Sequence, residues 1–233
     1  MRAEREKIFN LPPVTMNLIV LLAAMQLVVA YGPAPLANWL FETFAFIPAR
    51  VTLEGGAGAY LTMVAYAFLH GDWTHLIVNA LSLAAFGSPV ERRFGALPYL
   101  AFLAASAFCG ALLFLAFHPY DIAPVVGASA AISGTMGAIV RFAFTPGGRL
   151  AERRREPFST DEEGSDSISL MQLRSNRRAV LFLLAWFGVN FLLGAFPQAA
   201  GASSAIAWEA HIGGFLFGLL CFSLFDRGAR RAF

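Results

Sequence analysis

The sequence predicts an all-α, polytopic membrane protein with a single membrane domain over residues 1–233. Three observations support this. The chain is 58% hydrophobic but only 14% charged, whereas soluble domains carry about 25% charged residues. Several apolar stretches reach the roughly 20 residues that a helix needs to cross a bilayer. Lysine and arginine also segregate to one side of the resulting topology.

The apolar stretches predict six spans, at about 14–31, 72–90, 97–117, 127–145, 179–196 and 209–226. The first follows the charged segment MRAEREK, as the apolar region of a signal peptide would. Its apolar run is long for a signal peptide and five further spans follow it, so we expect a retained helix.

Charge sets the expected orientation. With the N-terminus inside, 16 of the 17 lysines and arginines fall on the inner side, and Arg50 is left outside. Cytoplasmic loops carry such an excess of positive charge, so we expect both termini in the cytoplasm.

Two long connections differ in character. The outer loop, about 32–71, contains LANWLFETFAFIPAR, which is apolar enough to lie partly in the membrane interface. The inner loop, about 146–178, is polar, charged and poor in aromatic residues. We expect a solvated connector there, and contact with anionic lipid or a regulator is the alternative.

Polar side chains inside the spans are expensive and usually functional. His75 and Asn79 lie one turn apart near the outer end of the second span, and Ser129 and His211 begin the fourth and sixth. Three helices therefore bring polar groups to one depth near the outer face. Ser133 shares a face with Ser129, one turn deeper.

This set matches an acyl-transfer site, with serine as nucleophile, histidine as base, and His75 and Asn79 as donors to an oxyanion. Glu209 is only two residues before His211 and should point elsewhere, so we expect a pair rather than a triad. Each residue has a structural alternative, such as packing for a serine among glycines. His70 and His118 fit interfacial residues, and Glu209 a solvated residue at a helix start.

Small residues make the approach of the helices possible. The fourth span carries Gly127, Ala130, Ala131, Gly134 and Ala138. The sixth carries the pair Gly214 and Gly218, and such faces let helix backbones pack closely.

Four segments together resemble the rhomboid family of intramembrane serine proteases: HGDWTHLIVN (70–79), VERRFG (90–95), GASA (127–130) and AHIGGFLFG (210–218). Their order and spacing cover roughly residues 60–226. The resemblance implies a six-helix rhomboid-like bundle with Ser129 as nucleophile and His211 as base. His75, Asn79 and the Ser129 backbone N–H would form the oxyanion hole, and Gly127 would belong to the nucleophile turn.

The resemblance also implies supporting roles. Gly214 and Gly218 would let the sixth helix pack on the fourth, while Glu91 and Arg92 would stabilise the inner end of the second span. By the same analogy, the fifth helix or the segment PQAAGASSAIAWE would control substrate access.

The sequence departs from the family at two positions. Ala130 replaces the glycine that commonly follows the nucleophile. Ser133 replaces an aromatic residue that many members place against the base, and we expect Ser133 to hydrogen-bond His211 instead, directly or through water.

The expected function is therefore cleavage of single-pass transmembrane proteins near the outer face of a membrane, by a Ser-His dyad and without a cofactor. We expect a bacterial inner membrane, with the site opening to the periplasmic side. A rhomboid-like pseudoprotease that binds clients without cutting is the alternative, and a small channel or transporter is another. A metal site is disfavoured, because His70 and His75 diverge by about 140° around a helix and no HExxH motif occurs.

Overall fold

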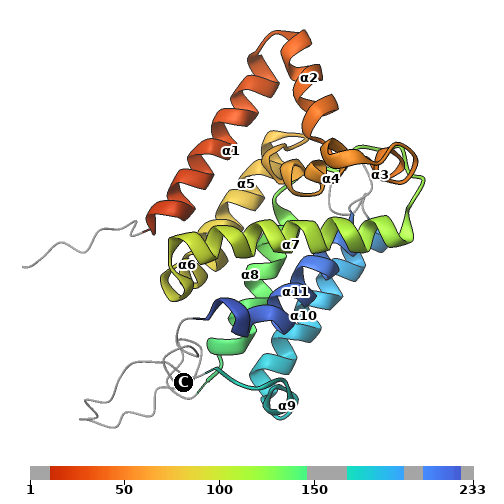
Figure 1. Ribbon diagram of the computed structural model, residues 1–233. Helices are drawn as coiled ribbons and strands as arrows, with labels where there is room; N and C mark the ends of the chain where they lie inside the picture. Colours follow the sequence, from red (N-terminus) through yellow and green to blue (C-terminus); the bar gives the residue numbers. More distant parts are fainter. Residues whose placement is uncertain (1–10, 146–166, 197–206, 227–233) are drawn as a thin grey trace, which may run out of the picture.

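The computed structural model describes residues 11–145, 167–196 and 207–226, and these residues are helical, without a strand. The elements, shown in Figure 1, are α1 (Pro13–Tyr31), α2 (Ala34–Phe44), α3 (Pro48–Leu53), α4 (Gly56–Ala65), the 3-10 turn η1 (Tyr66–Phe68), α5 (Trp73–Ser82), the π-helical turn η2 (Leu83–Gly87), α6 (Ser88–Phe94), α7 (Ala96–Phe117), α8 (Ser129–Phe142), α9 (Leu170–Leu173), α10 (Arg177–Ala195) and α11 (Trp208–Phe225). The predicted all-α membrane fold is confirmed.

Each predicted span overlaps a helical stretch. Among the described helices, α1, α7 and α11 are long and apolar enough to cross a membrane. The predicted second span is a chain of α5, η2 and α6, in which a π-helical turn interrupts the α-helix. α8 has 14 residues, fewer than the roughly 20 that a full crossing needs. The count of six spans therefore stays a prediction.

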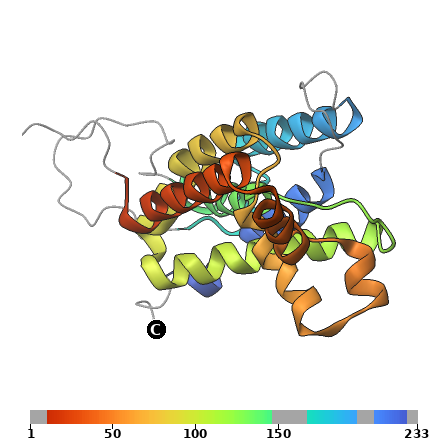
Figure 2. The same cartoon turned by 90° about the horizontal axis from the view of Figure 1, so that it is seen from above.

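The outer connection is not an irregular loop. It contains α2, α3, α4 and η1; α2 packs against α1, and Figure 2 shows α3 and α4 to one side of the bundle. Phe46 pairs with Val125 in an isolated antiparallel bridge, and the Gly127 N–H donates to the Tyr66 carbonyl at 3.0 Å. The outer connection thus holds the segment that leads into α8.

Several expectations lie outside the described residues. Most of the inner loop is among them, in residues 146–166, together with both termini and most of the segment PQAAGASSAIAWE.

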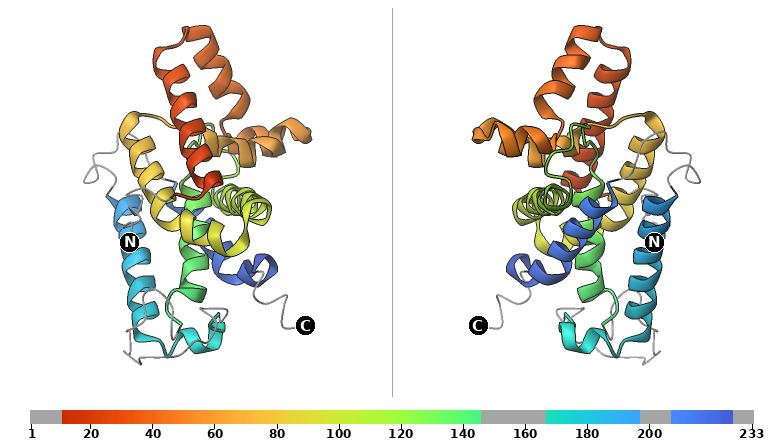
Figure 3. Two further views of the ribbon diagram at one scale, coloured as in Figure 1. Left: turned by 90° about the vertical axis from the view of Figure 1, so that its left-hand side faces the viewer. Right: turned by 90° about the vertical axis from the view of Figure 1, so that its right-hand side faces the viewer.

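Close backbone packing joins α7, α8 and α11 at the centre of the bundle. Figure 3 shows α8 running through the middle, with α10 along one edge. A Cβ at Gly218 would overlap the carbonyl oxygen of Gly134, and one at Gly214 would overlap that of Ala130. These glycines therefore let α11 lie directly against α8, as small residues do in membrane helix pairs.

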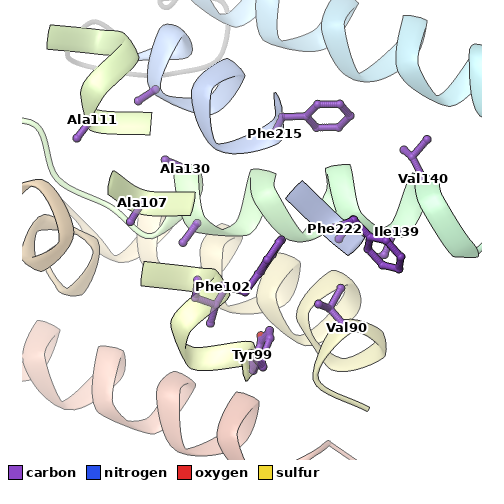
Figure 4. Packing of buried hydrophobic residues seen from close by; sticks show 14 of the residues in the cluster. Val90, Tyr99, Phe102, Ala107, Ala111, Ala130, Ile139, Val140, Phe215 and Phe222 are labelled. Carbon is purple, nitrogen blue, oxygen red and sulfur yellow. The ribbon is translucent and has the colours of Figure 1, made fainter. Parts of the chain in front are cut away.

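Larger side chains fill the space where these helices diverge. Phe102 from α7 and Phe222 from α11 are fully buried, and the small Ala130 of α8 is also buried. Figure 4 shows them in one cluster with Phe215 and Val90. Small side chains lie where the helices are close and large ones where they diverge. The apolar interior is therefore close-packed.

Ionic contacts close the end of the bundle that lies far from Ser129. The Glu91 carboxylate accepts hydrogen bonds from the backbone N–H groups of Val14 and Thr15, at 2.9 and 2.7 Å, and so caps the start of α1. Arg93 forms a bidentate pair with Asp226, at 2.9 and 2.7 Å. The arginine of this pair is Arg93, and the supporting role that the resemblance implies for Arg92 stays a prediction.

The glycine contact generates a test of this packing. We expect Gly218→Ala to lower the free energy of unfolding by about 1–3 kcal/mol, because the added methyl group forces α11 away from α8. Gly188→Ala is the matched control, since a Cβ at Gly188 meets no atom within 4 Å. Thermal unfolding in detergent measures both variants, and equal midpoints would contradict the packing role.

Candidate active site

The turn before α8 sets the position of Ser129, the first residue of that helix. Gly127 has a φ of 120°, which a side chain would strain. A Cβ there would also lie 2.6 Å from His75 Nε2 and 3.7 Å from Ser129 Oγ. Glycine therefore permits both the turn and the close approach of His75.

Ser129 and His211 are in direct contact. Ser129 Oγ lies 2.8 Å from His211 Nε2, and both residues are half-buried. Their sequence separation is 82 residues, and the packing of α11 on α8 brings them together. This distance is within the 2.6–3.2 Å range typical of a serine activated by a base.

A third side chain completes this set. Asn190 Oδ1 of α10 lies 2.8 Å from His211 Nδ1. This contact adds an amide partner that the predicted Ser-His pair does not include, while Glu209 points elsewhere, as expected. The sequence signal was an amide within the apolar run AVLFLLAWFGVNFLLGAF, because polar groups in membrane helices usually have a function.

His75 and Asn79 lie on one face of α5. Asp72 caps this helix by accepting from the His75 backbone N–H at 2.8 Å, a residue that the sequence reasoning did not single out. Its signal was an aspartate at the N-cap position, three residues before His75. Asn79 Nδ2 donates to the His75 carbonyl at 2.8 Å. An amide nitrogen carries two hydrogens, so one donor of Asn79 stays available.

Ser133 does not make the direct form of the predicted hydrogen bond to His211, and the form through water stays a prediction. Both ring nitrogens of His211 contact other side chains, Ser129 and Asn190. Ser133 is buried in α8, and no hydrogen bond joins it to His211 in the described part of the chain. The reason is depth, because Ser133 lies one turn below the level of the ring.

The two remaining histidines, His70 and His118, differ in burial and in their contacts. His70 is buried within the protein: it is 1% exposed, neither ring nitrogen has a partner among the described residues, and its ring centroid lies 5.0 Å from that of His75. His118 is 40% exposed, and its Nε2 lies 2.9 Å from Glu209 Oε1. Glu209 is thus paired with His118 rather than simply solvated.

The site offers no evident place for a metal. Across residues 11–145, 167–196 and 207–226, no three histidine, cysteine, aspartate or glutamate side chains form a group that could hold a metal ion. A cavity of about 100 Å³ lies beside the turn that precedes Ser129, and its walls are apolar. They include Ala128, Ala131 and Ile132 of the α8 region and Leu18 and Leu22 of α1. It suits an apolar group rather than an ion.

Comparison with known proteins places the chain in a family. The family model described as "Rhomboid domain" matches residues 57–227. The chain is 33% identical to the "Rhomboid protease GluP" of Bacillus subtilis (strain 168) over 104 residues, which cover 45% of this chain and 20% of that protein. It is 30% identical to "RHOMBOID-like protein 7" of Arabidopsis thaliana over 153 residues, 66% of this chain and 39% of that protein.

A second Arabidopsis thaliana protein, "RHOMBOID-like protein 12, mitochondrial", is 26% identical over 182 residues, which cover 75% of this chain and 49% of that protein. The chain thus matches between a fifth and about half of the length of these curated relatives.

The burial of His70, in the outer connection, generates a pH prediction. Burial, assisted by the neighbouring His75, lowers the pKa of His70 from 6.5 to about 4. Below pH 6.5 the unfolded chain takes up this proton more readily than the folded protein. Stability is therefore unaffected by His70 above pH 6.5, and it falls by about 3 kcal/mol as the pH drops to 4.

We expect His70→Phe to remove this part of the pH dependence, because phenylalanine keeps an aromatic ring beside His75 and binds no proton. Unfolding free energies at pH 7 and pH 4.5 measure the effect. The same loss in both proteins would show that His70 is not the group responsible.

Proposed function

Because this chain belongs to the rhomboid family, we propose that it is an intramembrane serine endopeptidase that cleaves single-pass membrane proteins. The observation that carries the proposal is the 2.8 Å contact between Ser129 Oγ and His211 Nε2. It joins the two segments, GASA and AHIGGFLFG, that resemble the family's nucleophile and base motifs.

The chemistry follows from this contact. His211 Nε2 takes the hydroxyl proton as Ser129 Oγ attacks the scissile carbonyl carbon and forms a tetrahedral intermediate. The C–N bond then breaks, and His211 returns the proton to the leaving amine. Water, deprotonated by His211, hydrolyses the acyl-enzyme and restores the Ser129 hydroxyl.

The oxyanion of each intermediate needs fixed donors. Ser129 begins α8, so its backbone N–H belongs to the first turn, where a helix leaves its amides without internal partners. The positive end of the helix dipole also favours a negative charge at this place. His75, whose Nε2 lies close to Gly127, and the second amide hydrogen of Asn79 are the proposed side-chain donors.

The protein is an integral membrane protein, and we place its active site toward the outer face. The charged side chains support this orientation. Arg141 lies at the end of α8 opposite Ser129, and Arg93 lies over the ring of Phe142 beside its partner Asp226. An inner end rich in arginine agrees with the positive-inside rule, and we propose a bacterial inner membrane as its location.

Two alanine substitutions one turn apart test the proposal. We expect Ser129→Ala to abolish cleavage of a labelled single-span substrate in liposomes, because no nucleophile remains. Ser133→Ala is the matched control, and we expect it to keep most of the activity because Ser133 makes no hydrogen bond to His211.

Cleavage that persists in Ser129→Ala would contradict the proposed nucleophile. Binding of the substrate without cleavage by the unsubstituted protein would instead support the pseudoprotease alternative.

A further inference from the structure

Asn190 lies on α10, outside the segments that carry the serine and the histidine. We infer that Asn190 is a positioning residue for His211, which it holds in the one tautomer that is able to accept the Ser129 proton. This inference rests on the proposed roles of Ser129 and His211. It adds α10 to the helices α5, α8 and α11, which carry the other residues of the proposed site.

The hydrogen bonds of Asn190 fix which way its amide faces. Asn190 Nδ2 donates to the Trp186 carbonyl, one turn earlier in α10, at 2.9 Å. The oxygen Oδ1 is therefore the atom 2.8 Å from His211 Nδ1. An amide oxygen only accepts, so Nδ1 must carry the proton of the neutral ring.

The tautomer of His211 decides whether its Nε2 is able to accept the Ser129 proton. A neutral imidazole has one N–H, and with Nδ1 protonated the other nitrogen, Nε2, has a free lone pair. Nε2 lies 2.8 Å from Ser129 Oγ. Without an acceptor at Nδ1 the ring is free to take the opposite tautomer, in which Nε2 carries a hydrogen and cannot accept the serine proton.

The surroundings support a specific role for this amide. Asn190 is 6% exposed, whereas its neighbours Val189 and Phe191 are 54% and 64% exposed on the outer side of α10. Burying an amide away from water is costly unless it is hydrogen-bonded. Both polar ends of Asn190 are bonded, and its oxygen is directed at the base.

Other groups near His211 do not supply this acceptor. Glu209, on the same helix, is bonded to His118. His75 of α5 does not supply it either, because the two ring nitrogens of His211 contact Asn190 and Ser129. α8 contributes Ser129, which is at Nε2.

The face of α10 that carries Asn190 also packs against α8 and α11. The Trp186 ring stacks on Phe215 of α11, with centroids 4.0 Å apart and planes 24° apart, and its Nε1 donates to Met136 Sδ of α8 at 3.1 Å. Asn190 lies one turn away on this face. The acceptor therefore reaches His211 only while α10 is packed against α8 and α11.

If Asn190 only stabilised the fold, replacing it would leave the His211 tautomer unchanged. The test therefore measures that tautomer directly. The chain has four histidines, which makes ¹⁵N labelling of histidine and assignment by single substitutions practicable. We expect the His211 signals of the unsubstituted protein to report the Nδ1–H tautomer. In Asn190→Leu, of similar size but without an acceptor, we expect that fraction to fall.

Kinetics supply the second readout. We expect Asn190→Leu to lower kcat by about tenfold or more with little change in KM. Val189→Ala, next in the sequence but facing away, should change neither. Asn190→Asp keeps the acceptor and should retain activity, with the acid limb of its pH–rate profile moved to higher pH, because a carboxylate favours the protonated ring.

The inference is overturned if His211 in the unsubstituted protein carries its proton on Nε2. It is also overturned if Asn190→Leu matches Val189→Ala in both kcat and tautomer, or if Asn190→Asp loses as much activity as Asn190→Leu. Should Asn190→Leu fail to fold, the tautomer of the unsubstituted protein and the Asn190→Asp profile still decide. Failure of the proposed function would appear differently, as absence of cleavage by the unsubstituted protein.

Discussion

The backbone contact between α8 and α11 is the constraint on which the rest of the structure depends. Gly214 and Gly218 leave no side chain between the helices, so α11 rests on the carbonyl groups of Ala130 and Gly134. Ser129 begins one of these helices and His211 lies in the first turn of the other. Their 2.8 Å contact is therefore a result of helix packing.

Other parts of the chain support this contact from outside the pair. The outer connection fixes the nucleophile turn through the hydrogen bond from Gly127 to Tyr66, and Asp72 caps the helix that presents His75. α10 adds Asn190 behind the histidine. Five helices or turns thus hold the surroundings of Ser129, and they bring together polar groups that are far apart in the sequence.

The sequence predicted the helices and the contacting residues Ser129 and His211 because both leave local signals. Long apolar runs mark membrane helices, and Ser129, His75 and His211 stand out as polar groups near the ends of such runs. The partner of His211 was not predictable in this way, since the face that Asn190 presents depends on how α10 packs. The burial of His70 likewise depends on helices in the outer connection, whose sequence suggested only an interfacial loop.

The central claim is that His211 activates Ser129 for attack, and reaction with a fluorophosphonate probe tests it most directly. Mass mapping of the labelled protein identifies the modified side chain without any need to know the substrate. We expect one adduct, on Ser129, formed at a much lower rate in His211→Gln. An adduct on another serine, or labelling of Ser129 at an unchanged rate in His211→Gln, would contradict the claim.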